Sequence, residues 1–196
     1  VHSANWTIHP GNADLEIQGN AATAVTSGRD YWNVSDFGPD SEVFVTITTK
    51  AAVNGDIDEI QARLVNIGSG TTDGYVLRFS VEAGEDENFV RRIDNGVQTT
   101  LGAVIGQEFT NGDGLGLEII GSTLQAYRRS AGSWATMGTS RSDSTYTGAG
   151  KIALRITNSV SRLDDFGGGT VVGAVPNLIG SFSLTQSGGM IGRRYI

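Results

Sequence analysis

The sequence contains no cysteine among its 196 residues. This absence excludes disulfide bonds, thiolate metal sites and a cysteine nucleophile, and it leaves the cellular compartment open. Apolar runs long enough to cross a membrane are also missing, because no stretch approaches the ~20 residues that a spanning helix requires. We therefore expect no membrane insertion.

Basic residues are few, since 14 lysines and arginines face 21 aspartates and glutamates and give a formal net charge of −7. Sequence-independent attraction to phosphate is therefore weak, and nucleic acid is not an expected partner. Proline is scarce as well, with three residues, whereas glycine is abundant, with 28. Because the glycines follow no triplet period, they indicate many tight turns rather than a collagen-like chain.

Alternation of apolar and polar residues with a period of two predicts β-strands. The pattern is clearest in residues 43–49, where β-branched side chains dominate. It recurs in residues 75–81, 89–93 and 152–157. Residues 56–65 also fit helical spacing, but we interpret them as a strand because Ile60, Ala62 and Leu64 alternate.

Turn signals join these strands into one all-β domain. Asn95-Gly96 and Gly121-Ser122 predict two hairpins, and Gly167–Gly169 predicts a further turn. The elements sum to roughly ten to fourteen short strands, which predicts a two-sheet antiparallel jelly-roll sandwich. We assign residues 1–172 to the sandwich and residues 173–196 to a C-terminal strand or arm of the same domain.

The order of several short segments is similar to that of a known superfamily. These segments are Gly74–Arg78, Arg91–Gly96, Leu115–Glu118, Leu124–Tyr127, Trp134, Gly148–Ile156 and Arg162–Phe166. Together they resemble the concanavalin A-like lectin/glucanase superfamily, in its laminin-G-like branch, over about residues 1–170. The resemblance implies two antiparallel sheets, one of them concave, with ligands in the concavity or at the edge loops. Because this fold hosts lectins, hydrolases, lyases, adhesins and viral surface proteins, it implies no single activity.

The resemblance also implies a structural calcium site, because superfamily members often bind Ca²⁺ between an early strand and the last one. The matching positions are Asp14, Glu16 and Asp165. Their spacing lacks the fixed ligand order of an EF-hand. In the alternative interpretation, Asp164 and Asp165 turn the chain ahead of Gly167–Gly169.

Glycosidases of the superfamily carry acidic residues on alternate positions of one strand, and the nearest match is the run Asp56-Ile57-Asp58-Glu59. Neighbouring strand residues point to opposite faces, so Glu59 cannot share a cleft with Asp56 and Asp58 unless a bulge intervenes. We therefore predict a chain without catalytic residues that is not an enzyme. A degenerate glycoside hydrolase remains a third alternative, carried by Asp56 and Asp58.

A sugar site needs an aromatic platform with planar polar side chains around it. Aromatic residues make up only 8% of the chain. The candidate ligand-binding residues are Tyr31, Trp32, Tyr127, Arg128 and Trp134. For Trp134, burial in the core is the alternative.

The remaining charged and titratable side chains have simple interpretations. Arg91 and Arg92, with Arg78, are interpreted as partners of cross-strand carboxylates, and the alternative is a charged groove for an acidic polysaccharide. His2 and His9 lie near the N-terminus without the spacing of a zinc site, and we expect both to be solvated.

These observations favour a non-catalytic, lectin-like surface module that binds a glycan or polysaccharide outside the cell. The alternative function is a viral or phage structural protein, such as a capsid decoration or tail component on the virion surface. In that case residues 173–196 anchor the chain in a homo-oligomer or a larger assembly. The low aromatic content, the many glycines and threonines and this C-terminal segment favour the alternative.

Overall fold

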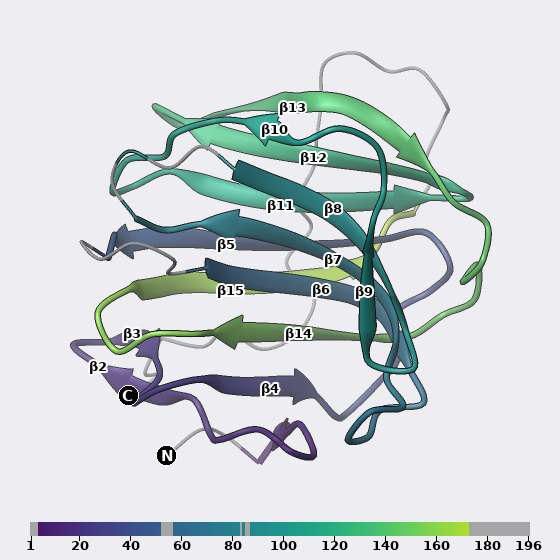
Figure 1. Ribbon diagram of the computed structural model, residues 1–196, viewed down its shortest axis with the longest axis horizontal. Helices are drawn as coiled ribbons and strands as arrows, with labels where there is room; N and C mark the ends of the chain where they lie inside the picture. Colours follow the sequence, from purple (N-terminus) through teal and green to yellow (C-terminus); the bar gives the residue numbers. More distant parts are fainter. Residues whose placement is uncertain (1–3, 52–56, 83, 85–86, 173–196) are drawn as a thin grey trace.

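The computed structural model describes residues 4–51, 57–82, 84 and 87–172. These residues form fifteen β-strands in two stacked layers (Figure 1). Within the described ranges there is no helix, and hence none that is long and apolar enough to cross a membrane. The predictions made for Asp56, His2 and residues 173–196 lie outside the described residues.

Both sheets are antiparallel throughout. One has eight strands, in the order β1 (Trp6–Ile8), β4 (Gly28–Trp32), β14 (Lys151–Ile156), β6 (Ile57–Val65), β7 (Asp73–Ser80), β8 (Glu87–Asp94) and β10 (Ile105–Gly106), with β9 (Val97–Thr100) also paired to β8. The other has seven, in the order β13 (Ser133–Ser142), β12 (Thr123–Ser130), β11 (Gly114–Ile120), β5 (Ser41–Thr49), β15 (Arg162–Thr170), β3 (Ala21–Thr23) and β2 (Glu16–Gln18). The predicted two-sheet jelly-roll sandwich is confirmed.

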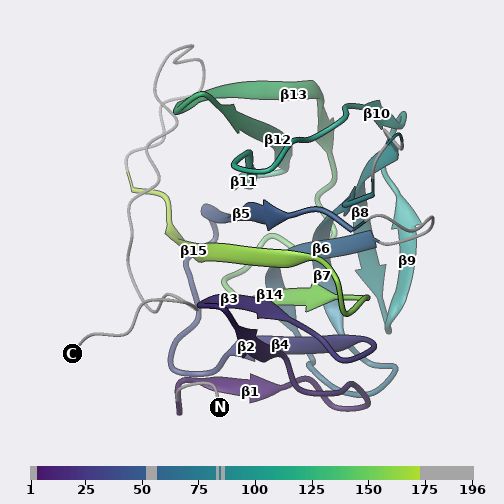
Figure 2. The same ribbon diagram turned by 90° about the vertical axis from the view of Figure 1, so that its left-hand side faces the viewer.

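The core lies between the two sheets, which face each other in Figure 2. The seven-stranded sheet contributes alternate apolar residues of β5 and β11, among them Val45 and Leu117. The eight-stranded sheet contributes Ile60, Leu77 and Leu154, which lie side by side in register. Alternate side chains of these strands therefore point into the core.

The strand and hairpin predictions are confirmed. The ambiguous segment 56–65 is strand β6 over its described part. At the first hairpin, Asn95 and Gly96 have φ values of 47° and 77°, as a tight two-residue turn between β8 and β9 requires. Gly121, with φ of 55°, begins the second hairpin, between β11 and β12.

A bulge in β6 reverses one predicted side-chain direction. The register with β7 shifts between Ala62 and Val65, and Arg63 has a φ of 50°. As a result Ile60 and Ala62 face the main core, whereas Leu64 packs in a separate apolar cluster on the other side of the sheet. The expectation that all three share one face was wrong, because the extra residue changes the alternation. Gly150 permits the bulge, since a Cβ there would lie 2.5 Å from the carbonyl carbon of Arg63.

The predicted turn at Gly167–Gly169 was also wrong, because these glycines lie within β15 and pair with β5. Their role is close packing rather than turning. A Cβ on Gly168 would lie 2.4 Å from the carbonyl oxygen of Glu42, and one on Gly167 would lie 2.6 Å from the ring of Phe44. The direction change expected near Asp165 is a bulge inside the strand, where Asp165 has a φ of 50°.

Candidate functional site

The register of the eight-stranded sheet brings a row of charged residues together on its outer face. In β14, Arg155 lies opposite both Arg29 of β4 and Glu59 of β6. Glu59 in turn lies opposite Arg78 of β7, which lies opposite Phe89 of β8. The core residue Leu154 precedes Arg155, so this row points away from the core. Three consecutive strands, β6, β7 and β8, and the more distant β4 and β14 thus contribute to one surface.

A second row lies beside the first, two residues away on each strand. It consists of Tyr31, Ala153, Gln61, Val76 and Arg91. Ala153 and Val76 belong to the outer apolar cluster, against which Tyr31 packs. The outer face is therefore apolar at one end and charged at the other.

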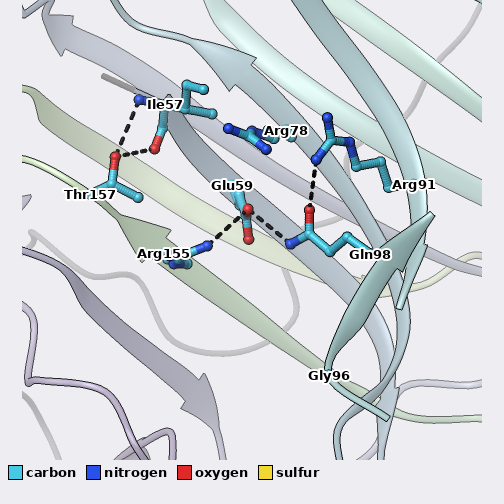
Figure 3. Close-up of a pocket in the computed structure, with 8 residues that line it drawn as sticks. All are labelled: Ile57, Glu59, Arg78, Arg91, Gly96, Gln98, Arg155 and Thr157. Atoms are coloured by element: carbon cyan, nitrogen blue, oxygen red, sulfur yellow. Dashed lines mark hydrogen bonds and ion pairs between the residues drawn. The ribbon is translucent and has the colours of Figure 1, made fainter. Parts of the chain in front are cut away.

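The charged end forms an open groove with a volume of about 460 Å³ (Figure 3). It is lined by Ile57, Glu59, Arg78, Arg91, Gly96, Gln98, Arg155 and Thr157. The β8–β9 hairpin forms one wall, and β9 stands on the outer side of the sheet (Figure 2). A groove of this volume lies within the usual range for a small-molecule site.

Glu59 organises the groove through three hydrogen bonds. Its carboxylate accepts from Gln61 Nε2 at 2.7 Å, from Gln98 Nε2 at 2.9 Å and from Arg155 Nη1 at 3.1 Å. Arg29 Nε extends the network by donating to Gln61 Oε1 at 2.8 Å. Glu59 is buried, with 2% of its surface exposed. These bonds hold the planar side chains in fixed directions.

Arg91 is positioned by two neighbours. Its guanidinium lies over the Phe89 ring, 4.5 Å from the centroid, and Nη1 donates to Gln98 Oε1 at 3.3 Å. Burial, followed by repulsion from the Arg78 guanidinium, lowers the pKa of Arg91. Figure 3 shows the guanidinium groups of Arg78 and Arg91 close together beside Glu59.

The predicted ligand-binding pair in β4 is divided between the two faces of the sheet. Trp32 is buried in the core, where its ring meets that of Trp6 edge to face, 5.7 Å between centroids. Tyr31 lies on the outer face, in the row next to the groove. Of this pair, only Tyr31 shares a surface with the charged row.

The second predicted cluster lies on the seven-stranded sheet. Tyr127 donates to Glu118 Oε1 at 3.1 Å, and the Trp134 ring, partly buried, lies 5.7 Å from the Arg129 guanidinium. Arg128 instead forms a 2.7 Å ion pair with Asp113. Because Arg128 alternates with Tyr127 and Arg129 along β12, it points to the other face.

The predicted calcium ligands occupy different elements. Asp14 precedes β2 and interacts with the buried Asp30, Glu16 lies exposed in β2, and Asp165 sits at the bulge of β15. Among the described residues, no three acidic or histidine side chains form a group that can hold a metal ion. Calcium binding stays a prediction.

The acidic run at the start of β6 is divided as strand geometry requires. Asp58 is buried and accepts hydrogen bonds from Thr157 N at 2.9 Å and Ser161 Oγ at 2.8 Å, whereas Glu59 points into the groove.

The expectation that His9 is solvated was wrong, because this side chain is buried. Its Nε2 lies 2.6 Å from Thr72 Oγ1, and burial lowers its pKa to about 4.

The arginines of β7 and β8 differ from the expected pairing with cross-strand carboxylates. Arg92 pairs with carboxylates, but with Asp94 of its own strand at 2.6 Å and with Asp143 after β13 at 2.8 Å. Arg78 and Arg91 line the groove. Sequence reasoning missed Arg155, Gln61 and Gln98 as parts of the same surface. The alternation within each strand predicts that these side chains point outward, but their alignment with one another depends on the register between strands.

The described strands form a two-sheet antiparallel sandwich with a charged groove on the outer face of one sheet. No family model matches the chain, and no curated protein matches its sequence. Solved structures match its fold. The carbohydrate binding module CBM66 from Bacillus subtilis aligns with a TM-score of 0.64 and 14% identity, over 84% of this chain and 95% of that one.

Two further structures give similar matches. A legume lectin-like domain from Entamoeba histolytica aligns with a TM-score of 0.60 and 11% identity, over 85% of this chain and 90% of its own. The Ca²⁺/Man-bound exoplasmic/lumenal domain of VIP36 aligns with a TM-score of 0.60 and 11% identity, over 81% of this chain and 79% of its own. These neighbours confirm the resemblance to the concanavalin A-like superfamily at the level of the fold.

Proposed function

We propose that this chain is a non-catalytic glycan-binding module, and that the groove on the outer face of the eight-stranded sheet is its binding site. The observation that carries the proposal is the network around Glu59, in which Gln61, Gln98 and Arg155 are held in place before any ligand arrives. Planar amide, carboxylate and guanidinium groups are suited to the paired hydroxyls of a sugar. A preorganised site loses little conformational entropy on binding.

The comparisons support the same class of function. The neighbours include a carbohydrate binding module, a lectin-like domain and a lumenal domain in a Man-bound form. Their identity with this chain is 14% or less, so the support comes from the shared sandwich. It is the groove residues of this chain that supply the argument for sugar binding.

The groove does not suit glycoside hydrolysis. Both the retaining and the inverting mechanism require two carboxyl groups that flank the scissile bond. Glu59 is the only carboxylate among the described residues that line the groove, and its oxygens already accept three hydrogen bonds. Asp58 lies on the opposite face of β6. This arrangement favours binding without catalysis.

An extracellular or virion-surface location is part of the proposal, because a glycan-binding module meets its ligands there. The alternative, a capsid decoration or tail component, depends on residues 173–196, which lie outside the described residues, and it stays a prediction.

A glycan array tests the proposal with one groove variant and one control. We expect the wild-type protein to bind a defined set of glycans and Gln98→Ala to weaken that binding about ten-fold, because it removes the hydrogen bonds to Glu59 and Arg91. Trp134→Ala, on the other sheet, should leave binding within about two-fold. Binding that survives Gln98→Ala and is lost with Trp134→Ala would place the site on the wrong sheet, and a blank array would refute the function.

A further inference from the structure

We infer that the groove recognises an acidic glycan, whose anionic group binds between Arg78 and Arg91. The inference rests on the proposed function and names its ligand class, a sugar that bears a carboxylate or a sulfate ester. Three observations on the described residues lead to it: the charge of the groove, its unused hydrogen-bond donors and the placement of the two arginines.

The charge of the groove is opposite to that of the chain. The chain carries a net charge of −7, whereas the groove is lined by Arg78, Arg91 and Arg155 against one carboxylate, that of Glu59. Arg29 lies next to Arg155 in the same row and adds a further positive charge. Burial, and then repulsion from Arg155, lowers the pKa of Arg29 to about 10, so it remains protonated at neutral pH. Among the described residues that line the groove, the positive charges therefore outnumber the negative ones.

The donors of these arginines exceed the acceptors around them. The Nε atoms of Arg78, Arg91 and Arg155 and Nη2 of Arg29 are buried without a hydrogen-bond partner in the described part of the chain. Arg78 donates to no described residue. Glu59, its cross-strand neighbour, accepts its hydrogen bonds from other side chains. Because unsatisfied charged donors are costly, a bound anion would gain affinity by accepting from them.

The placement of Arg78 and Arg91 suits a single small anion. Arg91 is fixed by Phe89 and Gln98, so its position changes little on binding. The two guanidinium groups are close enough to repel each other, and an anion between them removes that repulsion. The planar guanidinium fork matches carboxylate and sulfate oxygens in a bidentate manner. A neutral sugar can use the donors but cannot offset the charge.

Calorimetric titration tests the inference with three probes on the full chain: tetragalacturonate, its carboxyl-reduced neutral counterpart and a heparin-derived tetrasaccharide. We expect at least one acidic probe to bind about ten-fold or more tightly than the neutral one, with an affinity that falls as salt increases. The two acidic probes distinguish a carboxylate from a sulfate ligand.

The variants locate the effect. Arg78→Gln should weaken binding of the acidic probe about ten-fold or more, and Arg78→Lys should recover only part of the loss, since it restores charge without the fork. Arg129→Gln makes the same charge change on the other sheet, where Arg129 contacts Trp134 and Thr46, and should leave affinity within about two-fold. A chemical denaturation curve for each variant reports its stability.

The outcomes separate the inference from the function beneath it. Equal binding of acidic and neutral probes, lost in Gln98→Ala, overturns the acidic ligand and keeps the glycan-binding groove. The same weakening in Arg78→Gln and Arg129→Gln also overturns the inference, because it shows attraction by net charge alone. If none of the probes binds and an array of neutral and acidic glycans is blank, the proposed function fails and the inference fails with it.

Discussion

Replacement of Arg63 by methionine is expected to lower the free energy of unfolding by about 3–5 kcal/mol. Arg63 is the largest fully buried side chain of the described residues, with 1% of its surface exposed. Its guanidinium donates to the carbonyl oxygens of Gly121, Tyr146 and Ile119 at 2.8–3.3 Å. Methionine fills much of the volume but leaves these buried carbonyls without their donor.

The consequence reaches beyond one strand, because the three carbonyls belong to the β11–β12 turn region and to the segment before β14. Arg63 therefore connects the bulge of β6 by hydrogen bonds to the β11–β12 turn region and to the segment before β14. Urea unfolding followed by tryptophan fluorescence measures the loss. Arg129→Met, a partly exposed arginine in β12, is the matched control and should cost under about 1 kcal/mol. An equal, small loss in both variants would contradict the role assigned to Arg63.

Stability is expected to fall as pH rises from about 4 to about 7 on account of Asp30. This side chain is fully buried, and burial is the main cause that raises its pKa to about 7. A hydrogen bond with Asp14 and charge repulsion from Asp14 raise the pKa further. Between the usual aspartate pKa and 7, the folded state holds a proton that the unfolded state has released. Stability is therefore complete below the unfolded pKa and declines through this window, by up to about 4 kcal/mol.

Asp30→Asn isolates this effect, because asparagine cannot titrate. His9 works in the opposite sense over part of the window, since its lowered pKa of about 4 makes the folded state bind fewer protons than the unfolded state below 6.5. The diagnostic quantity is therefore the difference in unfolding free energy between wild type and Asp30→Asn. This difference should shift in favour of the variant as pH rises from 4.5 to 7.5. A difference that stays constant with pH would contradict the raised pKa.

Local features of the fold were predictable from the sequence. Period-two alternation identifies β5, β7, β8 and β14, and Asn95-Gly96 identifies a hairpin, because strand direction and turn geometry depend on neighbouring residues alone. The bulge at Arg63 was not predictable, since it depends on Gly150, which precedes β14 and is distant in the sequence. The same reason explains the error at Gly167–Gly169, where close packing against Glu42 and Phe44 demands glycine.

The site was only partly predictable. The sequence predicts a charged groove with Arg78 and Arg91 as one alternative, but it indicates Glu59 only as part of an acidic run and gives no signal for Arg155. Cross-strand register joins them, and register is set by the packing of whole sheets rather than by any local motif. Large aromatic residues suit sugars, but they also suit a core, and Trp32 packs in the core against Trp6.

The most direct test of the glycan-binding groove is an amide NMR titration of the full chain with the glycan that gives the strongest array signal. We predict that the largest shift changes cluster on β6, β7, β9 and β14, around Glu59, Arg78 and Gln98. Changes centred on Tyr127 and Trp134 of the seven-stranded sheet, with none around Glu59, would contradict the assignment of the binding site.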